Sequence, residues 1–411
     1  RGGGAVHLGA ALGQLVQRRA FLAFQRGFAL GARLLPWRTP TVLSGAGSLL
    51  KLPDVFSREG ASRPLVVASR RQCADERFLA LRAALEGRGV RPSVFSGVEP
   101  DPSVATVEKL AAQYRADGCD SFLVLGGGSP IDAAKVAAAR IVRPDKTVAQ
   151  LGGLLKVRRP LPLFIAVPTT AGTGSEATIA AVVTGEEHRK YAVSDLCLIP
   201  RYAVLDPTLT LSLPPAVTAQ TGMDALTHAV EAYLSLYYNT RETRALAESA
   251  VRDIFRYPPV ACRDGQSLTA RERMLRASFD AGCAFTRASV GNVHAIAHTL
   301  GGLYGIPHGL ACAVTLPVVL EDYGAAVHPH LARLGSLIGL TGTERERAVG
   351  FLAAIRALNA SLGIPDRFDG IRGEDLPRMA AWAAAETNPV YPVPVVYDQA
   401  RFRRVLERLR A

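Results

Sequence analysis

The stretch Gly291–Gly309, GNVHAIAHTLGGLYGIPHG, holds three of the eight histidines of the chain. His294 and His298 are four residues apart, so in a helix their imidazoles share one face. A Gly-Gly pair and then Pro307 follow, a pattern that predicts a turn folding His308 back toward the helix. The stretch therefore predicts that three imidazoles gather at one place in the fold.

A second segment, TGMDALTHAVEAYL, carries Asp224 and His228, again four residues apart on one helical face. Two helices that each carry such a pair can converge on one ion, and carboxylate with neutral imidazole suits divalent Fe, Zn, Mn or Co. We expect no cysteine to compete nearby. The alternative is a buried hydrogen bond between Asp224 and His228, with the other histidines as ordinary core residues. We favour the metal site, because the two short apolar segments hold half of the histidines and burying these unpaired is costly.

The segments GMDALTHAVEAYLS and NVHAIAHTLGGLYGIPHG resemble the two signature stretches of the iron-containing (group III) alcohol dehydrogenases, whose fold is like that of dehydroquinate synthase. The resemblance extends from about Leu43 to the C-terminus. It implies that the metal is held by four side chains, Asp224, His228, His294 and His308. It also implies that His298 is not a ligand but lies by the substrate, as a candidate catalytic group that relays a proton.

The composition of the 411-residue chain is that of a soluble globular protein with room for two domains, because 48% of the residues are apolar and 20% are charged. We expect no transmembrane segment, since no run of about eighteen apolar residues occurs. Six scattered cysteines and no evident signal peptide favour reduced thiols in a cytoplasm. The net charge of +12 does not predict a nucleic-acid partner, because the basic residues are spread along the chain and are mostly arginine.

Residues 1–38 are expected to form an amphipathic helical extension, and the first forty residues contain no Asp or Glu. One helical face carries apolar residues and the opposite face carries arginines; the apolar residues are Phe21, Phe24, Phe28 and Leu35. Three interpretations stay open: a surface helix packed on its own domain or on a second subunit, a segment that makes weak contact with a membrane surface, and an imported organelle presequence.

Residues 39–212 have the pattern of an α/β dinucleotide-binding domain with a mostly parallel sheet. Short apolar runs without alternation are typical of strands buried on both faces, and helical stretches separate them. The expected strands include Pro64–Ser69, Arg91–Ser96, Ser121–Leu125, Leu161–Val167 and Tyr202–Leu205. Beyond them the strand signals largely disappear, so residues 213–411 are expected to form an all-helical (all-α) metal-binding domain. We expect the active site in the cleft between the two domains.

The strand Ser121–Leu125 runs directly into the glycine-rich loop Gly126–Pro130, and a helix is expected from about Ile131. Glycines let a diphosphate approach the backbone, and the free N–H groups at a helix start meet its charge. Three glycines alone are a weak signal, but GGGSPIDAAK is nearly the cofactor loop of the family that the chain resembles. The resemblance implies cofactor contacts from Gly127, Gly128, Ser129 and Asp132.

A second loop, PTTAGTGSEAT, supplies small hydroxyls and backbone N–H groups beside the first. By composition alone it could be an ordinary structural loop. Its counterpart in the family lies along the nicotinamide half of the cofactor, which implicates Thr169, Thr170, Thr173 and Ser175. The resemblance further implies that Lys190 reaches the cofactor and that Leu209 lies near the adenosine.

The stretch PLVVASRRQ predicts the choice of cofactor. Many NAD-using members of the family carry an acidic residue just after this strand, where its carboxylate binds the adenosine ribose and repels a 2′-phosphate. Here Ser69 stands at that position and Arg70 and Arg71 follow, so a guanidinium is available to pair with phosphate. We therefore predict NADP over NAD, with Ser69 and Arg70 as contacts. The alternative is that both arginines are solvated surface residues and that NAD is used.

The resemblance implies a metal-dependent alcohol dehydrogenase that transfers hydride between an alcohol and a nicotinamide dinucleotide. Four protein ligands plus a substrate position suit Fe(II) better than a closed zinc site, so Fe(II) is favoured and Zn is the alternative. We expect a homodimer that acts on a small-molecule alcohol or aldehyde, with three apolar residues near the metal, Phe164, Phe285 and Leu303. Two other classes remain open, a lyase resembling dehydroquinate synthase and a non-catalytic binding protein.

Overall fold

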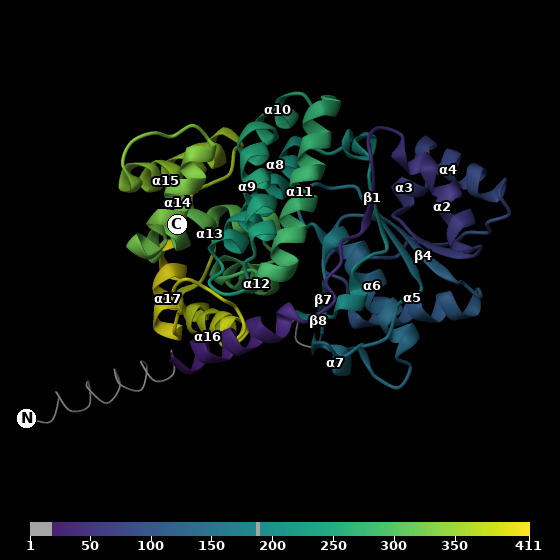
Figure 1. Ribbon diagram of the computed structural model, residues 1–411, viewed down its shortest axis with the longest axis horizontal. Helices are drawn as coiled ribbons and strands as arrows, with labels where there is room; N and C mark the ends of the chain where they lie inside the picture. Colours follow the sequence, from purple (N-terminus) through teal and green to yellow (C-terminus); the bar gives the residue numbers. More distant parts are fainter. Residues whose placement is uncertain (1–18, 186–189) are drawn as a thin grey trace, which may run out of the picture.

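The computed structural model describes residues 19–185 and 190–411. Figure 1 shows two halves side by side, an α/β half built from the purple-to-teal part of the chain and a helical half built from the green-to-yellow part. The predicted fold class is confirmed, because a six-stranded parallel sheet comes first and an all-helical region follows it.

The main sheet has the strand order β1-β9-β6-β4-β2-β3, and every neighbouring pair is parallel. Its strands are β1 (Thr41–Ser44), β2 (Pro64–Val67), β3 (Ser93–Phe95), β4 (Ser121–Gly126), β6 (Leu163–Pro168) and β9 (Tyr202–Leu205). The chain runs outward from β2 to β3 and then returns to the other side of β2, so the order reverses between β2 and β4. Ligands of open parallel sheets bind at the carboxyl ends of strands beside such a reversal. The topology thus indicates the cofactor site.

Helices cover both faces of this sheet. The core on one face contains residues of α5 (Val104–Ala116) and α6 (Gly128–Val142). The core on the other face contains residues of α2 (Leu52–Glu59) and α4 (Glu76–Glu86). Every residue of β2 and β4 is buried, which explains why these strands appear in the sequence as uninterrupted apolar runs.

A second sheet of three short strands was not predicted. It has the order β5-β8-β7, with β5 at Gly153–Leu154, β8 at Lys190–Ser194 and β7 at Ala180–Thr184. The strands β7 and β8 pair antiparallel, and β5 joins β8 in parallel. Each strand has at most five residues, which is too short for a clear periodic signal. This small sheet forms one wall of the interdomain cavity described below.

The helical half begins with α8 and shares one apolar core. Its helices are α8 (Pro215–Leu234), α9 (Arg241–Arg256), α10 (Pro258–Arg263), α11 (Leu268–Ala288), α12 (Asn292–Tyr304), α13 (His308–Tyr323), α14 (His328–Leu337), α15 (Glu344–Ser361), α16 (Leu376–Thr387) and α17 (Gln399–Arg408). Residues 222–235 of α8 and its C-cap are all buried. Polar side chains on this part of α8 therefore need partners inside the protein.

The stretch His308–Leu337 is long and apolar enough to cross a membrane by length and composition. It comprises α13, α14 and the turn between them, and 67% of its most apolar window is buried inside the protein. Such burial is what a core helix of this length shows, so the stretch is no convincing membrane span.

The described part of the N-terminal extension is helical over residues 19–33 and lies beside α16 on the helical half (Figure 1). We call it the N-terminal helix. Gln25 and Ala29 are buried in the contact, and the ring centroid of Phe28 lies 5.1 Å from that of Tyr238. The predicted apolar face is partly wrong, because Phe24 is 46% exposed whereas the polar Gln25 is fully buried. The contact matches the interpretation of a helix packed on its own domain; residues 1–18 of the predicted extension lie outside the described residues.

Candidate active site

Four side chains from three helices converge where α8, α12 and α13 meet. Oδ1 of Asp224 lies 3.8 Å from Nδ1 of His228, 3.7 Å from Nε2 of His294 and 3.5 Å from Nε2 of His308. Pro307 is the N-cap of α13, so His308 is the first residue of that helix and faces α8 from its end. The structure thus brings together the four residues that the sequence predicts as metal ligands.

Three buried atoms of this group have no hydrogen-bond partner among the described residues. They are Oδ1 of Asp224, Nδ1 of His228 and Nε2 of His294. Leaving one buried polar group unpaired costs about 1–3 kcal/mol, so three at one point call for a shared partner. A divalent cation satisfies all three at once, because carboxylate and neutral imidazole are ligands of iron and zinc. The residues present therefore fit a metal.

The protonation states of two of the three ligand imidazoles also fit a metal, which binds imidazole only in its neutral form. Burial lowers the pKa of His228 to about 3 and lowers that of His308 well below its ordinary range. Burial alone would raise the pKa of Asp224, but the neighbouring imidazoles hold it well below its ordinary value. Burial alone would lower the pKa of His294, but interactions with Cys312, Asp224 and Glu231 raise it well above its ordinary value. An ionised carboxylate thus faces two neutral imidazoles, and a metal would displace the proton that the His294 ring holds.

Glu231 orients the His294 imidazole from the far side. Its Oε2 lies 2.6 Å from Nδ1 of His294 and accepts a hydrogen bond from the N–H of Gly291, while Oε1 accepts one from the N–H of Val293. Because Nδ1 donates to this carboxylate, Nε2 is the nitrogen left to bind a metal beside Asp224. Sequence reasoning missed Glu231. The available signal was its spacing, seven residues after Asp224 on α8, which puts it near the ligand face.

Cys312 lies beside the ligands, so the expectation that no cysteine competes nearby is wrong. Its Sγ is 3.7 Å from Nε2 of His308. One ligand atom from each of four side chains falls within 4.8 Å of the others, and these side chains are Asp224, His294, His308 and Cys312. The cause is helical spacing, since Cys312 follows His308 by four residues on α13 and shares its face. Burial raises the pKa of this thiol to about 12.

His298, one turn after His294 on α12, interacts with a different carboxylate. Its Nδ1 lies 2.7 Å from Oε1 of Glu386, and the same oxygen accepts a hydrogen bond from Oη of Tyr391 at 2.9 Å. The ring centroid of His298 is 5.3 Å from that of His308. Sequence reasoning missed Glu386 and Tyr391, which become neighbours of His298 only in the folded chain.

A cavity of about 490 Å³ opens between the small sheet and the helices α12 and α16. The α/β half lines it with Ala149, Gly153, Val182, Lys190, Tyr191 and Ala192. The helical half lines it with His298, Thr299, Gly302, Trp382, Ala385, Glu386 and Tyr391. Nζ of Lys190, a predicted cofactor contact, pairs with Asp101 at 2.7 Å here. The volume is in the range of small-molecule sites.

The three apolar residues expected near the metal lie in different places. Phe285 flanks the ligands, with its ring centroid 4.2 Å from that of His228. Leu303 packs against the helical core from α12. The expectation for Phe164 is wrong, because this residue is 2% exposed and stacks on Phe122 in the core of the α/β half. A side chain in the middle of a strand covered on both faces points to a helix layer.

The two predicted cofactor loops lie against each other at the carboxyl ends of β4 and β6. A methyl group at Gly127 would come within 3.1 Å of Oγ1 of Thr170, and one at Gly128 would come within 2.9 Å of Cγ2 of Thr173. A side chain at Gly128 would therefore force the loops apart. The helix α6 begins at Gly128, a turn earlier than the expected Ile131, so its free N–H groups lie within the glycine loop.

Buried polar contacts tie the second loop to α6. Oγ of Ser175 donates to Asp132, whose carboxylate also accepts from the N–H of Val182 at 2.9 Å. The fully buried Lys135 donates from Nζ to oxygens between residues 175 and 180. Oγ of Ser129 accepts from the N–H of Asp101 at 3.3 Å. The carboxylate of Asp132 is thus engaged within the protein and holds Ser175 in place.

A smaller cavity of about 170 Å³ lies beside the reversal in strand order, with residues that follow β2 and β6 in its wall. The predicted cofactor residues Ser69, Thr169 and Leu209 line it. Ser69 caps α3 (Arg70–Cys73), and Gln72 of that helix donates to Oγ1 of Thr169 at 3.1 Å. The ends of β2 and β6, the two strands on either side of β4, are thereby joined at this cavity.

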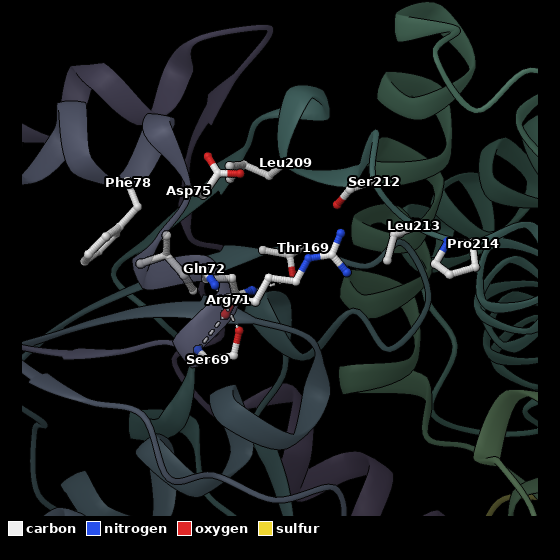
Figure 2. Close-up of a pocket in the computed structure, with 11 residues that line it drawn as sticks. Ser69, Arg71, Gln72, Asp75, Phe78, Thr169, Leu209, Ser212, Leu213 and Pro214 are labelled. Atoms are coloured by element: carbon white, nitrogen blue, oxygen red, sulfur yellow. Dashed lines mark hydrogen bonds between the residues drawn. The ribbon is translucent and has the colours of Figure 1, made fainter.

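The two arginines of α3 differ in position. Figure 2 shows the side chain of Arg71 extending across the small cavity toward Ser212 and Leu213. Arg70 is exposed and is not among the lining residues, although it is the arginine that the sequence predicts as a contact. Successive residues of a helix point about 100° apart, so the two neighbours face different directions.

The chain matches two family models in succession. The model described as iron-containing alcohol dehydrogenase matches residues 39–207, and that of the C-terminal region of the same family matches residues 218–408. The chain belongs to the iron-containing alcohol dehydrogenases. It is therefore an oxidoreductase that acts on alcohols, and neither the lyase nor the non-catalytic binding protein is favoured.

Relatives of this alcohol dehydrogenase match it over most of their length. The 1,3-propanediol dehydrogenase of Klebsiella pneumoniae is 40% identical over 314 residues, which are 74% of this chain and 80% of that protein. The NAD-dependent methanol dehydrogenase of Bacillus methanolicus is 31% identical over 85% of this chain and 94% of its own. A solved 1,3-propanediol oxidoreductase superposes with a TM-score of 0.86 at 33% identity, covering 92% of this chain and all of that one.

Proposed function

We propose that this alcohol dehydrogenase transfers hydride between an alcohol and a nicotinamide dinucleotide, in the cleft where the small sheet faces α12 and α16. The observation that carries the proposal is a group of three buried atoms, on Asp224, His228 and His294, that have no partner among the described residues, with the cavity-lining His298 one turn away. These residues would hold a metal that would supply a Lewis acid for the substrate oxygen, and the cavity beside them leaves room for the nicotinamide ring.

The proposed metal ligands are Asp224, His228, His294 and His308, with Fe(II) as the metal and Zn as the alternative. The bound metal supplies a Lewis acid that lowers the pKa of the substrate hydroxyl. Cys312 is left out of the set, because three imidazoles and one carboxylate suit Fe(II), whereas a soft thiolate favours zinc.

His298 is the proposed catalytic group that moves the proton. Its Nδ1 donates to the carboxylate of Glu386, which leaves Nε2 unprotonated and able to accept a proton released by the substrate. Because His298 lines an open cavity, the proton passes from it to water. Glu386 and Tyr391 keep the ring in one orientation during this transfer.

The dinucleotide is proposed to lie along the carboxyl ends of β4 and β6. Its diphosphate meets the N–H groups at the start of α6, where the glycines leave room for it. The proposed contacts are Ser69, Gly127, Gly128, Ser129, Thr169, Thr170, Thr173, Ser175, Lys190 and Leu209. Asp132 acts through Ser175, which it holds by a buried hydrogen bond.

The proposed cofactor preference is NADP(H), with Arg71 in place of Arg70 as the phosphate-binding arginine. Residue 69 is a serine and not an acidic residue, so it does not repel a 2′-phosphate. The guanidinium of Arg71 crosses the cavity that Ser69 lines. The carboxylate of Asp75, which also lines this cavity, is bound by Arg77 at 2.8 Å and is thereby neutralised. A relative named for its use of NAD shows that the family also accommodates the other cofactor.

The proposed substrates are short or medium aliphatic alcohols and the matching aldehydes. Trp382, Tyr391 and small residues line much of the cavity, and the one lysine or arginine among its described lining residues, Lys190, is paired with Asp101. Such a wall has few groups that could pair with a charged substrate. The relative from Klebsiella pneumoniae is named for a three-carbon diol, which is of this class.

The assembly and location of the chain are also proposals. We propose that the chain forms a homodimer. We also propose that it works in a reducing cytoplasm, which agrees with its six free cysteines. We further propose three units, an extension over residues 1–38, the dinucleotide-binding domain over 39–212 and the metal-binding domain over 213–411.

The function is tested by following reduced nicotinamide absorbance with the full chain reconstituted anaerobically with Fe(II) or Zn(II). We expect turnover of two- to six-carbon alcohols and aldehydes that depends on added metal and exceeds turnover of carboxylated analogues. Metal-independent turnover, or no turnover of any alcohol or aldehyde with either cofactor, would refute the proposal. Phosphate release from phosphorylated acids would instead indicate the lyase.

A further inference from the structure

The N-terminal helix reaches the wall of the interdomain cavity through one buried amide. Nε2 of Gln25 donates to the carbonyl of Pro389 at 3.0 Å and to that of Tyr391 at 2.8 Å. Gln25 is fully buried although it is polar and lies on a helix whose neighbouring side chains are mostly exposed. This helix precedes the family-matched residues 39–207 and 218–408, so the contact is made by a part of the chain outside both matches.

Gln25 fixes a short connection that we call the wall segment, residues 389–392, which follows α16. Four successive carbonyls of this segment have donors. Gln25 binds two of them, Oη of Tyr238 binds that of Val390 at 3.1 Å, and the N–H of Leu236 binds that of Pro392 at 2.9 Å. Tyr238 is itself packed on Phe28 of the N-terminal helix. Three of the four hydrogen bonds therefore come from this helix or from a residue that it contacts.

The wall segment leads directly to the proposed proton-transfer group. Oη of Tyr391 donates to Oε1 of Glu386 at 2.9 Å, and this oxygen lies 2.7 Å from Nδ1 of His298. Tyr391, Glu386 and His298 all line the 490 Å³ cavity. A continuous set of contacts thus runs from Gln25 through the Tyr391 backbone to the His298 imidazole.

We propose that Gln25 is a positioning residue for the reaction, and that the N-terminal helix acts as a clamp that holds Tyr391 and Glu386 against His298. The inference rests on the proposed role of His298. Without the amide donor, two partly buried carbonyls lose their partner and the wall segment loosens. Tyr391 then binds Glu386 less often, and the carboxylate no longer holds His298 in one orientation and tautomer.

The clamp differs in its consequences from a purely structural anchor. The metal ligands lie on α8, α12 and α13, and the proposed dinucleotide site lies in the α/β half, so neither depends on the wall segment. Loss of the clamp should therefore lower kcat while metal content and nucleotide affinity stay unchanged. A structural anchor alone would lower thermal stability and leave the kcat of the folded fraction as it was.

The test compares Gln25→Ala and Gln25→Met in the full, metal-loaded chain with Leu30→Ala as the matched control. Leu30 lies on the same helix and is 63% exposed. We expect both Gln25 variants to lose about 10-fold in kcat, with bound metal and nucleotide Kd equal to those of the parent, and Leu30→Ala to behave as the parent. Gln25→Met keeps the side-chain length without the donor, so it provides the measurement if Gln25→Ala does not fold.

A double-mutant cycle with Tyr391→Phe tests the route. If Gln25 acts through Tyr391, the double variant should lose little more than Tyr391→Phe alone. Additive losses would overturn the proposed route, and an unchanged kcat in both Gln25 variants would overturn the clamp. These outcomes are distinguishable from failure of the proposed function, because in that case the parent protein itself would show no alcohol dehydrogenase turnover.

Discussion

The carboxylate of Glu231 decides which nitrogen of His294 is available to a metal. It binds Nδ1 of that ring and two N–H groups at the start of α12, so it fixes both the imidazole and the helix that carries it. A carboxylate behind a ligating histidine also makes the imidazole more basic. Glu231 is therefore part of the proposed metal site although it is not one of the four proposed ligands.

We expect Glu231→Gln to lower metal affinity about 10–100-fold, because a neutral amide holds the imidazole less firmly. Competition with a chelator measures this affinity. Glu248→Gln is the control, since Glu248 pairs with Arg333 and Tyr233 outside the ligand group. Equal metal affinity in the two variants would show that Glu231 does not support metal binding.

A second prediction for single residues concerns the choice between NADP(H) and NAD(H). Arg71→Ala should weaken the binding of NADP(H) about 10-fold or more, which is the loss of affinity expected for one charge-assisted hydrogen bond. Ser69→Asp should shift preference toward NAD(H), because its carboxylate repels a 2′-phosphate. The exposed Arg70 provides the control Arg70→Ala. Steady-state kcat/KM with both cofactors measures these effects, and a parent that clearly prefers NAD(H) would contradict the assignment.

At the scale of elements, a buried lysine joins α6 to the loop that precedes β7. Nζ of Lys135 donates to the carbonyls of Ser175, Thr178 and Ala180 and to the hydroxyl of Thr178. Glu176 is buried beside it, and one of its oxygens has no partner among the described residues. Burial raises the pKa of Glu176 to about 7, whereas the ordinary value is 4.5.

This shift predicts how the stability of the element depends on pH. Between pH 4.5 and 7 the carboxyl ionises in the unfolded chain but keeps its proton in the folded one, so its contribution to stability falls as the pH rises. Glu176→Gln should therefore exceed the parent in unfolding free energy by on the order of 1–3 kcal/mol at pH 8 and by little at pH 5. Denaturant unfolding at both pH values measures the difference. An equal difference at the two pH values would contradict the shift.

The elements that the sequence predicts best are those whose signal is local. The strands β4 and β9 were predicted to within one residue, because both are uninterrupted apolar runs. That Asp224 and His228 share one face of α8, and His294 and His298 one face of α12, follows from helical spacing, whereas the ligand assignment came from the resemblance. By contrast, the burial of Gln25 could not be predicted, because its two acceptors lie more than 360 positions away. Glu386 and Tyr391 were missed for the same reason, since only packing brings them to the site. Cys312 was missed although its spacing of four residues from His308 on α13 was a local signal.

At the scale of the whole molecule, the N-terminal helix lies outside the two matched regions yet contacts the cavity wall. Deleting residues 1–34 should leave metal content and nucleotide affinity unchanged, because the ligands and both cofactor loops lie downstream. The same deletion should lower kcat about 10-fold, as the loss of Gln25 does. Metal analysis, nucleotide titration and steady-state kinetics on the truncated chain test this. Loss of folding would show instead that the helix is part of a core.

The central claim is that turnover requires a metal bound by Asp224, His228, His294 and His308. The most direct measurement is an anaerobic titration of metal-free protein with Fe(II), in which bound metal and the rate of aldehyde reduction are recorded on the same sample. We expect the rate to rise in proportion to bound metal up to one equivalent, in the parent and in Cys312→Ser alike. In His308→Ala, bound metal and rate should both be largely lost, whereas His298→Ala should bind metal fully and turn over about 10²-fold more slowly. Full turnover by the metal-free parent, or parental metal binding in His308→Ala, would contradict the claim.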